Sequence, residues 1–166
     1  KKNVEHIEAK VLTTNEEKMH IFEGIGIDYL IECPFTREVM CMEPEDFIRM
    51  LVEKLNVKCI VAGEDFHFGH NRKGNAGFLK TLEEAYDMKV IVMEKECFNG
   101  REISSTYIRE SLALGNMELV GELLGYEYPV SGIVQHGKKL GRRLGMPTVN
   151  LIPEPGKLLP PCGVYY

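Results

Sequence analysis

Residues 59–74 join an apolar run to side chains that can bind flat and charged molecules. Residues 59–62 are apolar, which is typical of a buried strand. Gly63 to Gly74 then hold acidic, aromatic, histidine and cationic side chains. A strand that opens into such a loop is typical of a ligand site at the carboxyl edge of an α/β sheet. The glycines would admit a ligand and the aromatic rings would face a planar one. On composition alone, a polar connection after a strand is the better interpretation.

A second polar group, Ser104, Ser105, Thr106 and Arg109, lies at a predicted helix start. The first turn of a helix offers free N–H groups and a partial positive charge, and hydroxyls there are usually caps. Arg109 is unusual, because a cation near that end is unfavourable unless an anion binds there too. Its spacing from Ser105 and Thr106 puts the three on one helix face. The residues alone favour caps and a phosphate site equally.

A third segment, residues 137–150, places four cations in a glycine-rich turn of an acidic protein. A solvated loop is the usual explanation of such a run. Three regularly spaced glycines, Gly137, Gly141 and Gly145, also indicate a backbone that wraps a ligand, and phosphate suits both features. The segment lacks the Gly-Lys-Ser/Thr of a Walker A loop, so it is not one.

Helices and strands that could position these groups alternate along the chain. Residues 14–17, Thr-Asn-Glu-Glu, form a capping box, which predicts a helix over 18–23 that stops at Gly24 or Gly26. We expect a strand over 28–33, a helix with one apolar face from about Pro44, and a strand over 57–62.

The same alternation continues beyond the loop. It predicts a helix over 77–87, a strand over 89–93, and helices that close at Gly115 and Gly125. The whole pattern favours right-handed βαβ units around a parallel sheet. After Gly125 the helical periodicity is lost, and residues 130–136, 148–151 and 163–166 are strand-like. We therefore place a boundary between Gly125 and Pro129, with an antiparallel β domain after it.

Composition limits the class of protein. The chain has 166 residues, 44% hydrophobic residues and a net charge of −5, which argues against general nucleic-acid binding. No apolar run approaches the ~20 residues of a membrane span, and no signal-peptide core follows the first residues. The five cysteines are widely spaced, odd in number and lack Cys-x-x-Cys. We expect reduced, mostly buried thiols of a cytoplasmic protein, which is a monomer or a weak oligomer.

The three segments occur in the order found in one enzyme family. Residues 63–74 read Gly-x-Asp-Phe-x-Phe-Gly-x-x-Arg-x-Gly, which resembles the flavin-site motif of the bacterial bifunctional riboflavin kinase/FMN adenylyltransferases, or FAD synthetases. The resemblance implies a flavin site formed by Gly63, Asp65, Phe66, Phe68, Gly69 and Arg72.

The other two segments resemble nucleotide-binding elements of the same family. Residues 103–109, Ile-Ser-Ser-Thr-x-x-Arg, resemble the signature that serves the triphosphate during adenylyl transfer, which implies an ATP site of Ser104, Ser105, Thr106 and Arg109. Residues 137–150 resemble the riboflavin kinase element Gly-x-x-x-Gly-x-x-Leu-Gly-x-Pro-Thr-x-Asn, and residues 156–165 match its continuation. This implies that Mg²⁺ and ATP phosphates are held by Thr148 and Asn150, with Gly137, Lys138, Gly141 and Gly145 around the phosphates.

His67-Phe68-Gly69-His70 also matches His-x-Gly-His, the catalytic signature of nucleotidyltransferases. In the resembled family the catalytic pair follows the first strand, which lies upstream of Lys1. We therefore interpret His67 and His70 as polar loop residues without a metal, and we expect the catalytic residues outside this chain.

The resemblance implies a fold and an activity. The fold is α/β: a Rossmann-like nucleotidyltransferase parallel sheet, as the FMN adenylyltransferase domain over 1–125, and the start of an antiparallel riboflavin kinase β-barrel over 126–166. The activity is the ATP-dependent phosphorylation of riboflavin to FMN and the adenylylation of FMN to FAD. The partners are Mg²⁺, ATP and flavins, with no nucleic acid and no membrane.

Two other functions remain open at this point. One is a non-catalytic flavin- or nucleotide-binding module derived from the family. The other is an adenylyltransferase for pantetheine phosphate or nicotinamide mononucleotide, which the element at Thr148 and Asn150 disfavours. Because parts of both family domains are expected beyond the chain, we expect these 166 residues alone to make little or no FMN or FAD. We also expect one ligand cleft between residues 63–74 and 104–109.

Overall fold

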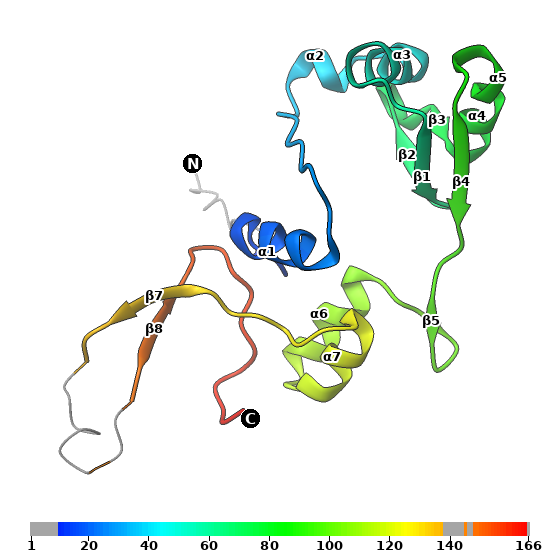
Figure 1. Cartoon of the computed structure of the whole chain (residues 1–166). Helices are drawn as coiled ribbons and strands as arrows, with labels where there is room; N and C mark the ends of the chain where they lie inside the picture. Colours follow the sequence, from blue (N-terminus) through cyan, green and yellow to red (C-terminus); the bar gives the residue numbers. More distant parts are fainter. Residues whose placement is uncertain (1–9, 138–144, 146–147, 166) are drawn as a thin grey trace, which may run out of the picture. The chain divides into compact units, whose positions relative to one another are not determined.

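The computed structural model describes residues 10–137, 145 and 148–165. Two compact units are present. Figure 1 colours the chain along its sequence, from blue at the N-terminus to red at the C-terminus. The central unit is Ile31–Glu102, and the terminal unit joins the stretch up to Leu30 with the region from Ile103 onward. Each helix within the described residues is too short or too polar to cross a bilayer.

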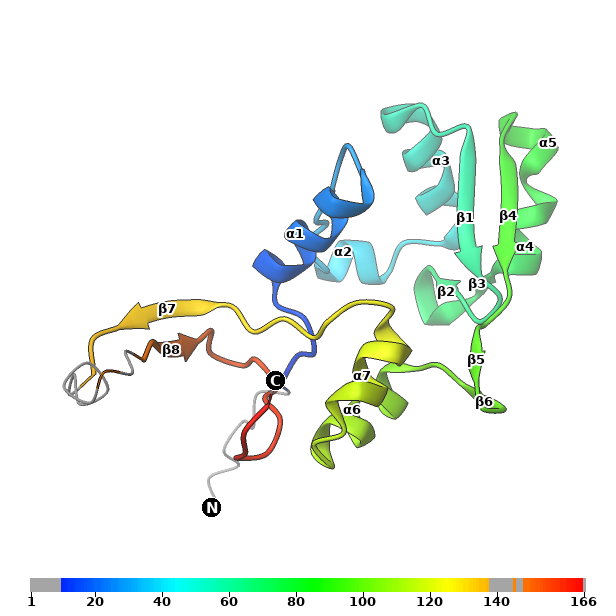
Figure 2. The ribbon, with the colours of Figure 1, turned by 60° about the horizontal axis from the view of Figure 1, so that its bottom comes forward.

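A parallel pair of strands forms the centre of the central unit. β1 (Cys59–Gly63) pairs with β4 (Lys89–Met93) along the full length of both. α3 (Pro44–Leu55) lies beside β1, and α4 (Ala76–Thr81) and α5 (Glu83–Tyr86) lie beside β4 (Figures 1 and 2). The predicted α/β class is therefore confirmed as a mixed α/β fold, whose parallel part is two strands.

The core of the central unit lies on one face of this sheet. Ile48 of α3 and Leu79 of α4 are 1% and 0% exposed and belong to one buried cluster with Ala62 and Val90. Val61, which points to the other face, is 61% exposed. Burial thus alternates along β1. The buried face of the strand packs against the helices, and the predicted flavin loop begins at the end of this strand.

Two helices replace the single helix predicted over 77–87. α4 ends and α5 begins at Leu82, whose N–H donates to the Leu79 carbonyl oxygen at 3.1 Å. Such an i−3 hydrogen bond tightens the turn and interrupts the α-helical ladder. Leu82 and Leu79 both stay buried, so the apolar periodicity that predicted one helix survives the break.

The strand predicted over 28–33 was wrong. This segment forms no strand in the described part of the chain, and α2 (Arg37–Met40) follows it. Its apolar side chains remain exposed, with Tyr29 at 86% and Ile31 at 64%. The residue types favour a strand, but a strand also needs a hydrogen-bonded neighbour, which the residue types do not provide.

The terminal unit begins with α1 (Asn15–Ile25), and the predicted capping box is present at its start. The Glu17 N–H donates to Thr14 Oγ1 at 3.2 Å, and the Thr14 N–H donates to Glu17 Oε2 at 3.0 Å. The helix closes at Gly26, which takes the left-handed conformation with φ of 87°.

α6 (Ser105–Ala113) and α7 (Met117–Leu124) lie side by side in the same unit (Figures 1 and 2). Leu112 and Val120 are fully buried in them. α7 ends at Gly125 with φ of 76°, as the glycine position predicted.

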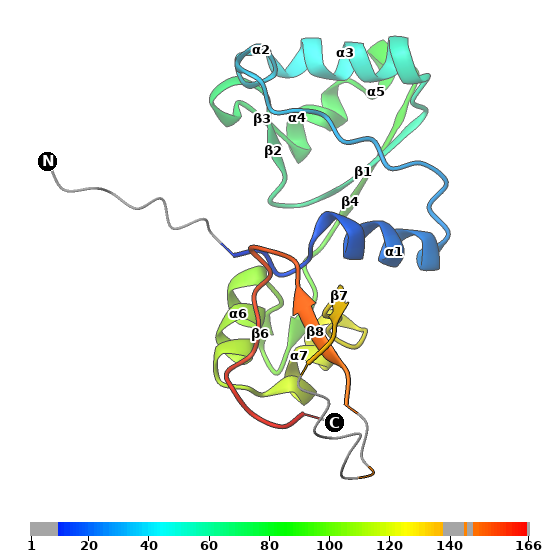
Figure 3. The same cartoon turned by 90° about the vertical axis from the view of Figure 1, so that its left-hand side faces the viewer.

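β7 (Gly132–Gln135) and β8 (Asn150–Pro153) form an antiparallel pair (Figures 1 and 3). Gly132 lies so close to Ile152 that a Cβ atom would overlap the Ile152 carbonyl oxygen. Residues 163–165 form no strand. Within the described residues this sheet has two strands with mostly exposed side chains, so the β-barrel remains a prediction.

All five cysteines are free and exposed, so the prediction of mostly buried thiols was wrong. Cys59 starts β1 and Cys97 lies in the small hairpin of β5 (Cys97–Phe98) and β6 (Arg101–Glu102). The apolar character of cysteine predicts burial on average, but these positions lie at strand starts, in turns and in irregular segments that the core does not cover.

Candidate functional site

The predicted flavin loop is a folded hairpin that follows β1. It contains β2 (His67–Phe68), the short 3₁₀ helix η1 (His70–Arg72) and β3 (Gly74–Asn75), with β2 and β3 paired antiparallel. At its far end, Asn75 Oδ1 accepts a hydrogen bond from the Phe78 N–H at 2.8 Å and caps α4. The loop is therefore fixed by a strand at one end and a helix at the other.

Two aromatic rings of this loop stack on each other. The centroids of Phe66 and Phe68 are 5.4 Å apart and the ring planes differ by 17°. Phe68 is 9% exposed and also contacts the rings of Phe47 and Phe78, whereas Phe66 is 40% exposed. The structure thus places Phe68 in the core and leaves the stacked ring of Phe66 partly open to solvent.

Two glycines of the loop allow close packing around these rings. Gly69 has φ of 70°, and a Cβ atom there would lie 2.7 Å from Pro44 Cγ and 2.8 Å from Pro44 Cα. A Cβ atom on Gly74 would lie 2.7 Å from the Phe68 ring. Because α3 begins at Pro44, Gly69 is the point at which the loop docks on that helix.

Asp65 lies at the start of the loop beside Gly63, where a Cβ atom would come within 3.3 Å of Asp65 Oδ1. The Asp65 carboxylate is 3.3 Å from Lys95 Nζ, and Glu102 lies 2.9 Å from the same ammonium. The hydrogen bonds from Lys95 to Glu102 and to Asp65 raise the pKa of Lys95. Asp65 is therefore held at the base of the loop by a cation.

Arg72, the predicted flavin-binding cation, has an exposed guanidinium and a backbone φ of 58°. His67 Nδ1 is 2.7 Å from the Asp65 carbonyl oxygen, which only accepts, so Nδ1 carries the proton and donates. Arg72 Nη2, 3.4 Å from the same nitrogen, is then a neighbouring donor and not a hydrogen-bond partner. With Nδ1 donating, the Arg72 guanidinium has no hydrogen-bond acceptor among the described residues.

His70 has a different set of partners. Its backbone N–H donates to the Met42 carbonyl oxygen at 2.7 Å, and its Nδ1 lies 3.4 Å from Glu43 Oε1. Lys73 Nζ is 3.0 Å from both oxygens of Glu43. The Lys73 ammonium lowers the pKa of Glu43, and His70 lowers it further. His70 thus joins the loop to the start of α3, while His67 bonds within the loop.

The predicted ATP site lies at the start of α6 in the terminal unit. Ser104 is the N-cap, and its Oγ accepts a hydrogen bond from the Tyr107 N–H at 3.2 Å, so this hydroxyl is a cap. Ser105 and Thr106 are exposed, and their hydroxyls make no hydrogen bond within the described residues. Those two hydroxyls, and the free N–H groups of the first turn, are available to an anion.

Arg109 lies one turn further along α6, on the face of Ser105. Its Nη1 donates to the Lys10 carbonyl oxygen at 2.8 Å, which fixes the guanidinium and leaves its other N–H groups unused by that bond. Residues 63–74 belong to the central unit and 104–109 to the terminal unit, so a shared cleft stays a prediction.

The predicted kinase-side residues are described in part. Lys138 and Gly141 lie outside the described residues. Asn150 begins β8, and a Cβ atom on Gly137 would overlap the Asn150 amide nitrogen. Only glycine at position 137 therefore leaves the Asn150 side chain in its place.

Thr148 and Gly145 belong to the same segment. Gly145 has φ of 75°, which favours glycine, and Thr148 and Asn150 are exposed. A hydroxyl and an amide oxygen are hard donors that suit Mg²⁺, which takes few protein ligands and completes its shell with phosphates and water. The two residues fit the predicted role.

A buried ion pair in the terminal unit was missed by sequence reasoning. Lys157 Nζ lies 2.6 Å from Glu17 Oε2, and the two side chains are 0% and 1% exposed. The other Glu17 oxygen accepts from the Ser131 N–H at 2.9 Å. Lys157 also donates to the Leu12 carbonyl oxygen at 2.7 Å and lies 4.1 Å from the centroid of the Tyr128 ring.

Burial and the charges of this cluster shift the pKa values of Glu17 and Tyr128. Burial raises the pKa of Glu17, but the Lys157 hydrogen bond and backbone N–H groups lower that pKa by more, so the net shift is downward. Burial and the Glu17 charge raise the pKa of Tyr128 to about 12, against the opposing charge of Arg109. The capping box already explained Glu17, and no sequence pattern pairs two residues 140 positions apart.

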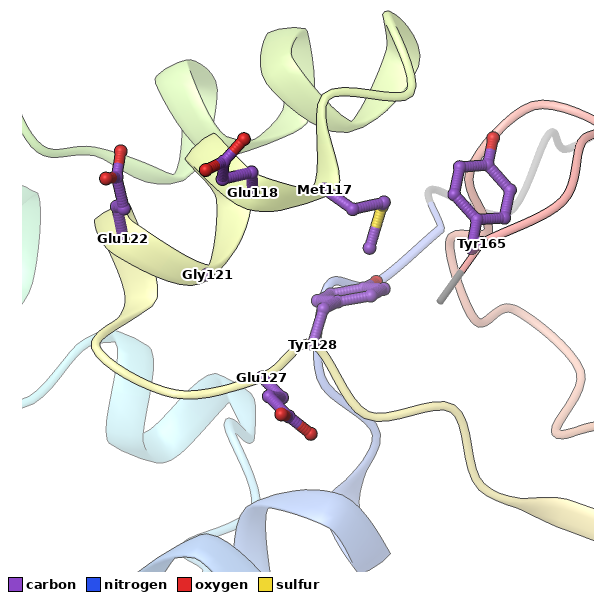
Figure 4. Close-up of a pocket in the computed structure, with 7 residues that line it drawn as sticks. All are labelled: Met117, Glu118, Gly121, Glu122, Glu127, Tyr128 and Tyr165. Carbon is purple, nitrogen blue, oxygen red and sulfur yellow. The ribbon is translucent and has the colours of Figure 1, made fainter.

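A pocket of about 640 Å³ lies in the same unit (Figure 4). The side chain of Met117 runs toward the ring of Tyr128 there. Its described lining residues are Met117, Glu118, Gly121, Glu122, Glu127, Tyr128 and Tyr165. Three are glutamates and none is a lysine or arginine, so the pocket does not favour a phosphate. None of these described lining residues is a predicted site residue.

Two protein families match adjoining parts of the sequence. The family described as FAD synthetase matches residues 2–107, and the family described as riboflavin kinase matches residues 124–166. The first match alone covers more than half of the chain. The matches stand in the order that the motifs predicted.

Individual proteins give the same result. The bifunctional riboflavin kinase/FMN adenylyltransferase of Escherichia coli strain K12 is 36% identical over 93% of this chain and 49% of its own length. The corresponding protein of Bacillus subtilis strain 168 is 37% identical over 93% of this chain and 49% of its own. The chain thus spans about half the length of the curated relatives it matches.

Solved structures also share the fold. One of them is a crystal structure described as a macrolide-efflux protein from Streptococcus pneumoniae, with a TM-score of 0.76 and 31% identity over 90% of this chain and 48% of that chain. The predicted family resemblance is confirmed by the family matches and the relatives together. This chain belongs to the FAD synthetase family.

Proposed function

We propose that the natural full-length protein phosphorylates riboflavin with ATP to give FMN, and adenylylates FMN with a second ATP to give FAD and pyrophosphate. The observation that carries this proposal is the tandem order of the two matches, FAD synthetase over 2–107 and riboflavin kinase over 124–166. Both reactions need mainly the positioning of phosphates and the stabilisation of their charge.

In this proposal residues 1–125 belong to a Rossmann-like FMN adenylyltransferase domain and residues 126–166 begin a riboflavin kinase β-barrel. The parallel pair β1 and β4 supports the first assignment, and the antiparallel pair β7 and β8 supports the second. The protein acts in the cytoplasm as a monomer or weak oligomer on small molecules. A net charge of −5 is consistent with the lack of a nucleic-acid partner.

The flavin is bound by the hairpin loop of the central unit. The exposed Phe66 ring, backed by Phe68, offers a flat apolar surface for the isoalloxazine ring, and Arg72 offers donors to its polar edge or phosphate. The proposed flavin-binding residues are Gly63, Asp65, Phe66, Phe68, Gly69 and Arg72. Gly69 and Gly74 keep this surface in place, because any side chain there would displace Pro44 or Phe68.

The ATP phosphates of the adenylyl transfer are bound at the start of α6. Ser105 and Thr106 present free hydroxyls, Ser104 orders the first turn, and Arg109 adds a positive charge one turn along. This combination of donors, helix dipole and cation matches the developing negative charge of the transferred phosphate.

The second ATP is bound by the glycine-rich segment before β8. Its proposed ligands are Gly137, Lys138, Gly141, Gly145, Thr148 and Asn150. Thr148 and Asn150 would hold Mg²⁺, which neutralises phosphate charge when bound. The contact of Gly137 with the Asn150 amide sets the position of that side chain.

The test is an assay of the natural full-length protein with riboflavin, ATP and Mg²⁺, with FMN and FAD separated by chromatography. Arg109→Ala should lower FAD formation about ten- to a hundred-fold and leave riboflavin phosphorylation intact, since one charge-assisted contact is worth roughly 1.5–3 kcal/mol. Arg49→Ala removes an exposed arginine that pairs with Asp46 and should change neither rate. Absence of both products in the unmodified protein would overturn the proposal.

A further inference from the structure

Arg109 is held in place by the backbone of a segment distant in sequence. Its Nη1 donates to the Lys10 carbonyl oxygen at 2.8 Å, a bond between residues 99 positions apart. Arginine has a planar fork of N–H donors, so one bond at one end orients the whole group. The place of the guanidinium therefore depends on where Lys10 lies.

The segment 10–12 is in turn held by the region before and after Lys157. The Val11 N–H donates to the Gly156 carbonyl oxygen at 2.8 Å, and the Leu158 N–H donates to the Val11 carbonyl oxygen at 2.8 Å. Lys157 Nζ donates to the next carbonyl along, that of Leu12, at 2.7 Å. We call residues 10–12 the strap.

Lys157 is fixed by its own surroundings. Its ammonium is 2.6 Å from Glu17 Oε2 and 4.1 Å from the Tyr128 ring, and its side chain is 0% exposed. The Tyr128 hydroxyl donates to the Leu158 carbonyl oxygen at 2.8 Å. All these contacts lie within the terminal unit.

A buried ion pair is weak support for stability, because removing two charges from water costs as much as their attraction returns. Its better-attested use is to specify one arrangement among several, since any other arrangement leaves a charge buried alone. Here the arrangement that it specifies includes the strap, and the strap orients Arg109.

We propose that Lys157 is a positioning residue for FMN adenylylation: through the strap it orients the Arg109 guanidinium toward the ATP phosphates. This inference rests on the proposed function. It makes adenylyl transfer depend on a residue of the segment that matches riboflavin kinase, residues 124–166. Formation of FAD is thereby coupled to a correctly folded start of the kinase part.

The experiment is a double-mutant cycle in the natural full-length protein, with Lys157→Met, Arg109→Ala and the two combined. FMN adenylylation is measured with FMN supplied and ATP varied. Lys157→Met should raise KM for ATP about three- to ten-fold, and Arg109→Ala should lower kcat/KM about ten- to a hundred-fold. The combined variant should be no worse than Arg109→Ala alone, because Lys157 acts through Arg109. Losses that multiply would overturn the inference.

Two further variants keep the result interpretable. Val120→Ala removes volume at a fully buried position of α7, in a different element from the strap, so it should lower stability and leave KM for ATP unchanged. If Lys157→Met does not fold, Glu17→Met combined with Lys157→Met restores an uncharged core of similar volume. That protein should fold with a lower unfolding temperature, because the Thr14 and Ser131 N–H groups lose their acceptor on Glu17. It should still show the raised KM, because no ammonium reaches the Leu12 carbonyl. An unchanged KM in this folded variant rejects the inference.

The proposed function and this inference fail in different ways. If Arg109→Ala has no effect on FAD formation, the proposed phosphate site is wrong and the inference falls with it. If Arg109→Ala cripples the reaction but the Lys157 variants do not, the phosphate site stands and Lys157 has no positioning role.

Discussion

The ring of Phe66 lies on the ring of Phe68 with centroids 5.4 Å apart, yet the two rings have opposite surroundings. Phe68 is 9% exposed and is enclosed by Phe47 and Phe78, whereas Phe66 is 40% exposed. The two aromatic residues of one motif thus have different structural roles. One builds the core of the central unit, and the other presents a flat face at the surface.

Substitution of each ring should separate these roles. Phe66→Ala should leave the midpoint of thermal unfolding almost unchanged and weaken FMN binding about two- to ten-fold, since an aromatic pair is worth about 0.5–1.5 kcal/mol. Phe68→Ala should lower the free energy of unfolding by about 3–5 kcal/mol. Calorimetry and a fluorescence titration of FMN measure the two effects. Equal loss of stability in both variants would contradict the division.

Gly69 and Gly100 provide a matched pair of left-handed glycines. Their φ values are 70° and 78°, but a Cβ atom on Gly69 would meet Pro44 at 2.7–2.8 Å and one on Gly100 would meet nothing within 4 Å. Gly100→Ala should cost about 1–2 kcal/mol of unfolding free energy from backbone strain alone. Gly69→Ala should cost clearly more, because α3 or the loop must move, and should also weaken FMN binding. Similar losses in denaturant unfolding would show that the Pro44 contact is unimportant.

Local signals predicted those elements that local chemistry determines. The capping box at Thr14 and Glu17 is present, the strand over 89–93 has the predicted bounds, and α7 closes at Gly125. The cap and the helix end depend on residues within one or two turns of chain, and the strand over 89–93 has β1 as its hydrogen-bonded neighbour. The strand over 28–33 failed because a strand also depends on a neighbour that residue types do not specify.

The candidate site likewise combines features that the sequence predicts with contacts that it does not predict. The motif could predict that Phe66 and Phe68 belong to one loop, but which ring is buried depends on Phe47 and Phe78, from two different helices. The partners of Arg109 and Lys157 were unpredictable for the same reason. Both side chains donate to backbone carbonyl oxygens of residues 10–12. Because every residue has a backbone carbonyl, the sequence does not indicate which one accepts the hydrogen bond.

Acid should destabilise the terminal unit through Glu17. The folded pKa of Glu17 lies below 4.5, so its stabilising contribution is present above about pH 4.5 and is lost as the pH falls through the folded value. Glu17→Gln leaves Lys157 buried without its charge partner and should cost about 3–5 kcal/mol of unfolding free energy at pH 7. The difference between the two proteins should shrink as the pH falls below 4.5 and through the lowered folded pKa, where Glu17 becomes protonated in the native state.

Glu43 supplies the control for this pH series. Its pKa is also lowered, by Lys73 and then by His70, but its side chain is 49% exposed. Glu43→Gln should therefore change the unfolding free energy little at any pH, since solvent screens the pair. Chemical denaturation between pH 3 and pH 7 measures both variants. A Glu17→Gln deficit that stays constant with pH would contradict the ionic origin of the contact.

Riboflavin phosphorylation should depend on the contact between Gly137 and Asn150. Because a Cβ atom at position 137 would overlap the Asn150 amide nitrogen, Gly137→Ala should displace that side chain. The expected result is a fall of about ten-fold in kcat/KM for the kinase step, which corresponds to about 1.4 kcal/mol, and a higher Mg²⁺ requirement. FAD formation from supplied FMN should be unchanged, and Gly24→Ala, where nothing lies within 4 Å, should affect neither step.

Asn150→Ala should produce the same defect as Gly137→Ala. Adding Gly137→Ala to Asn150→Ala should produce little more, because both changes remove one interaction. Additive losses in the kinase assay would show that Gly137 acts on the phosphates by itself.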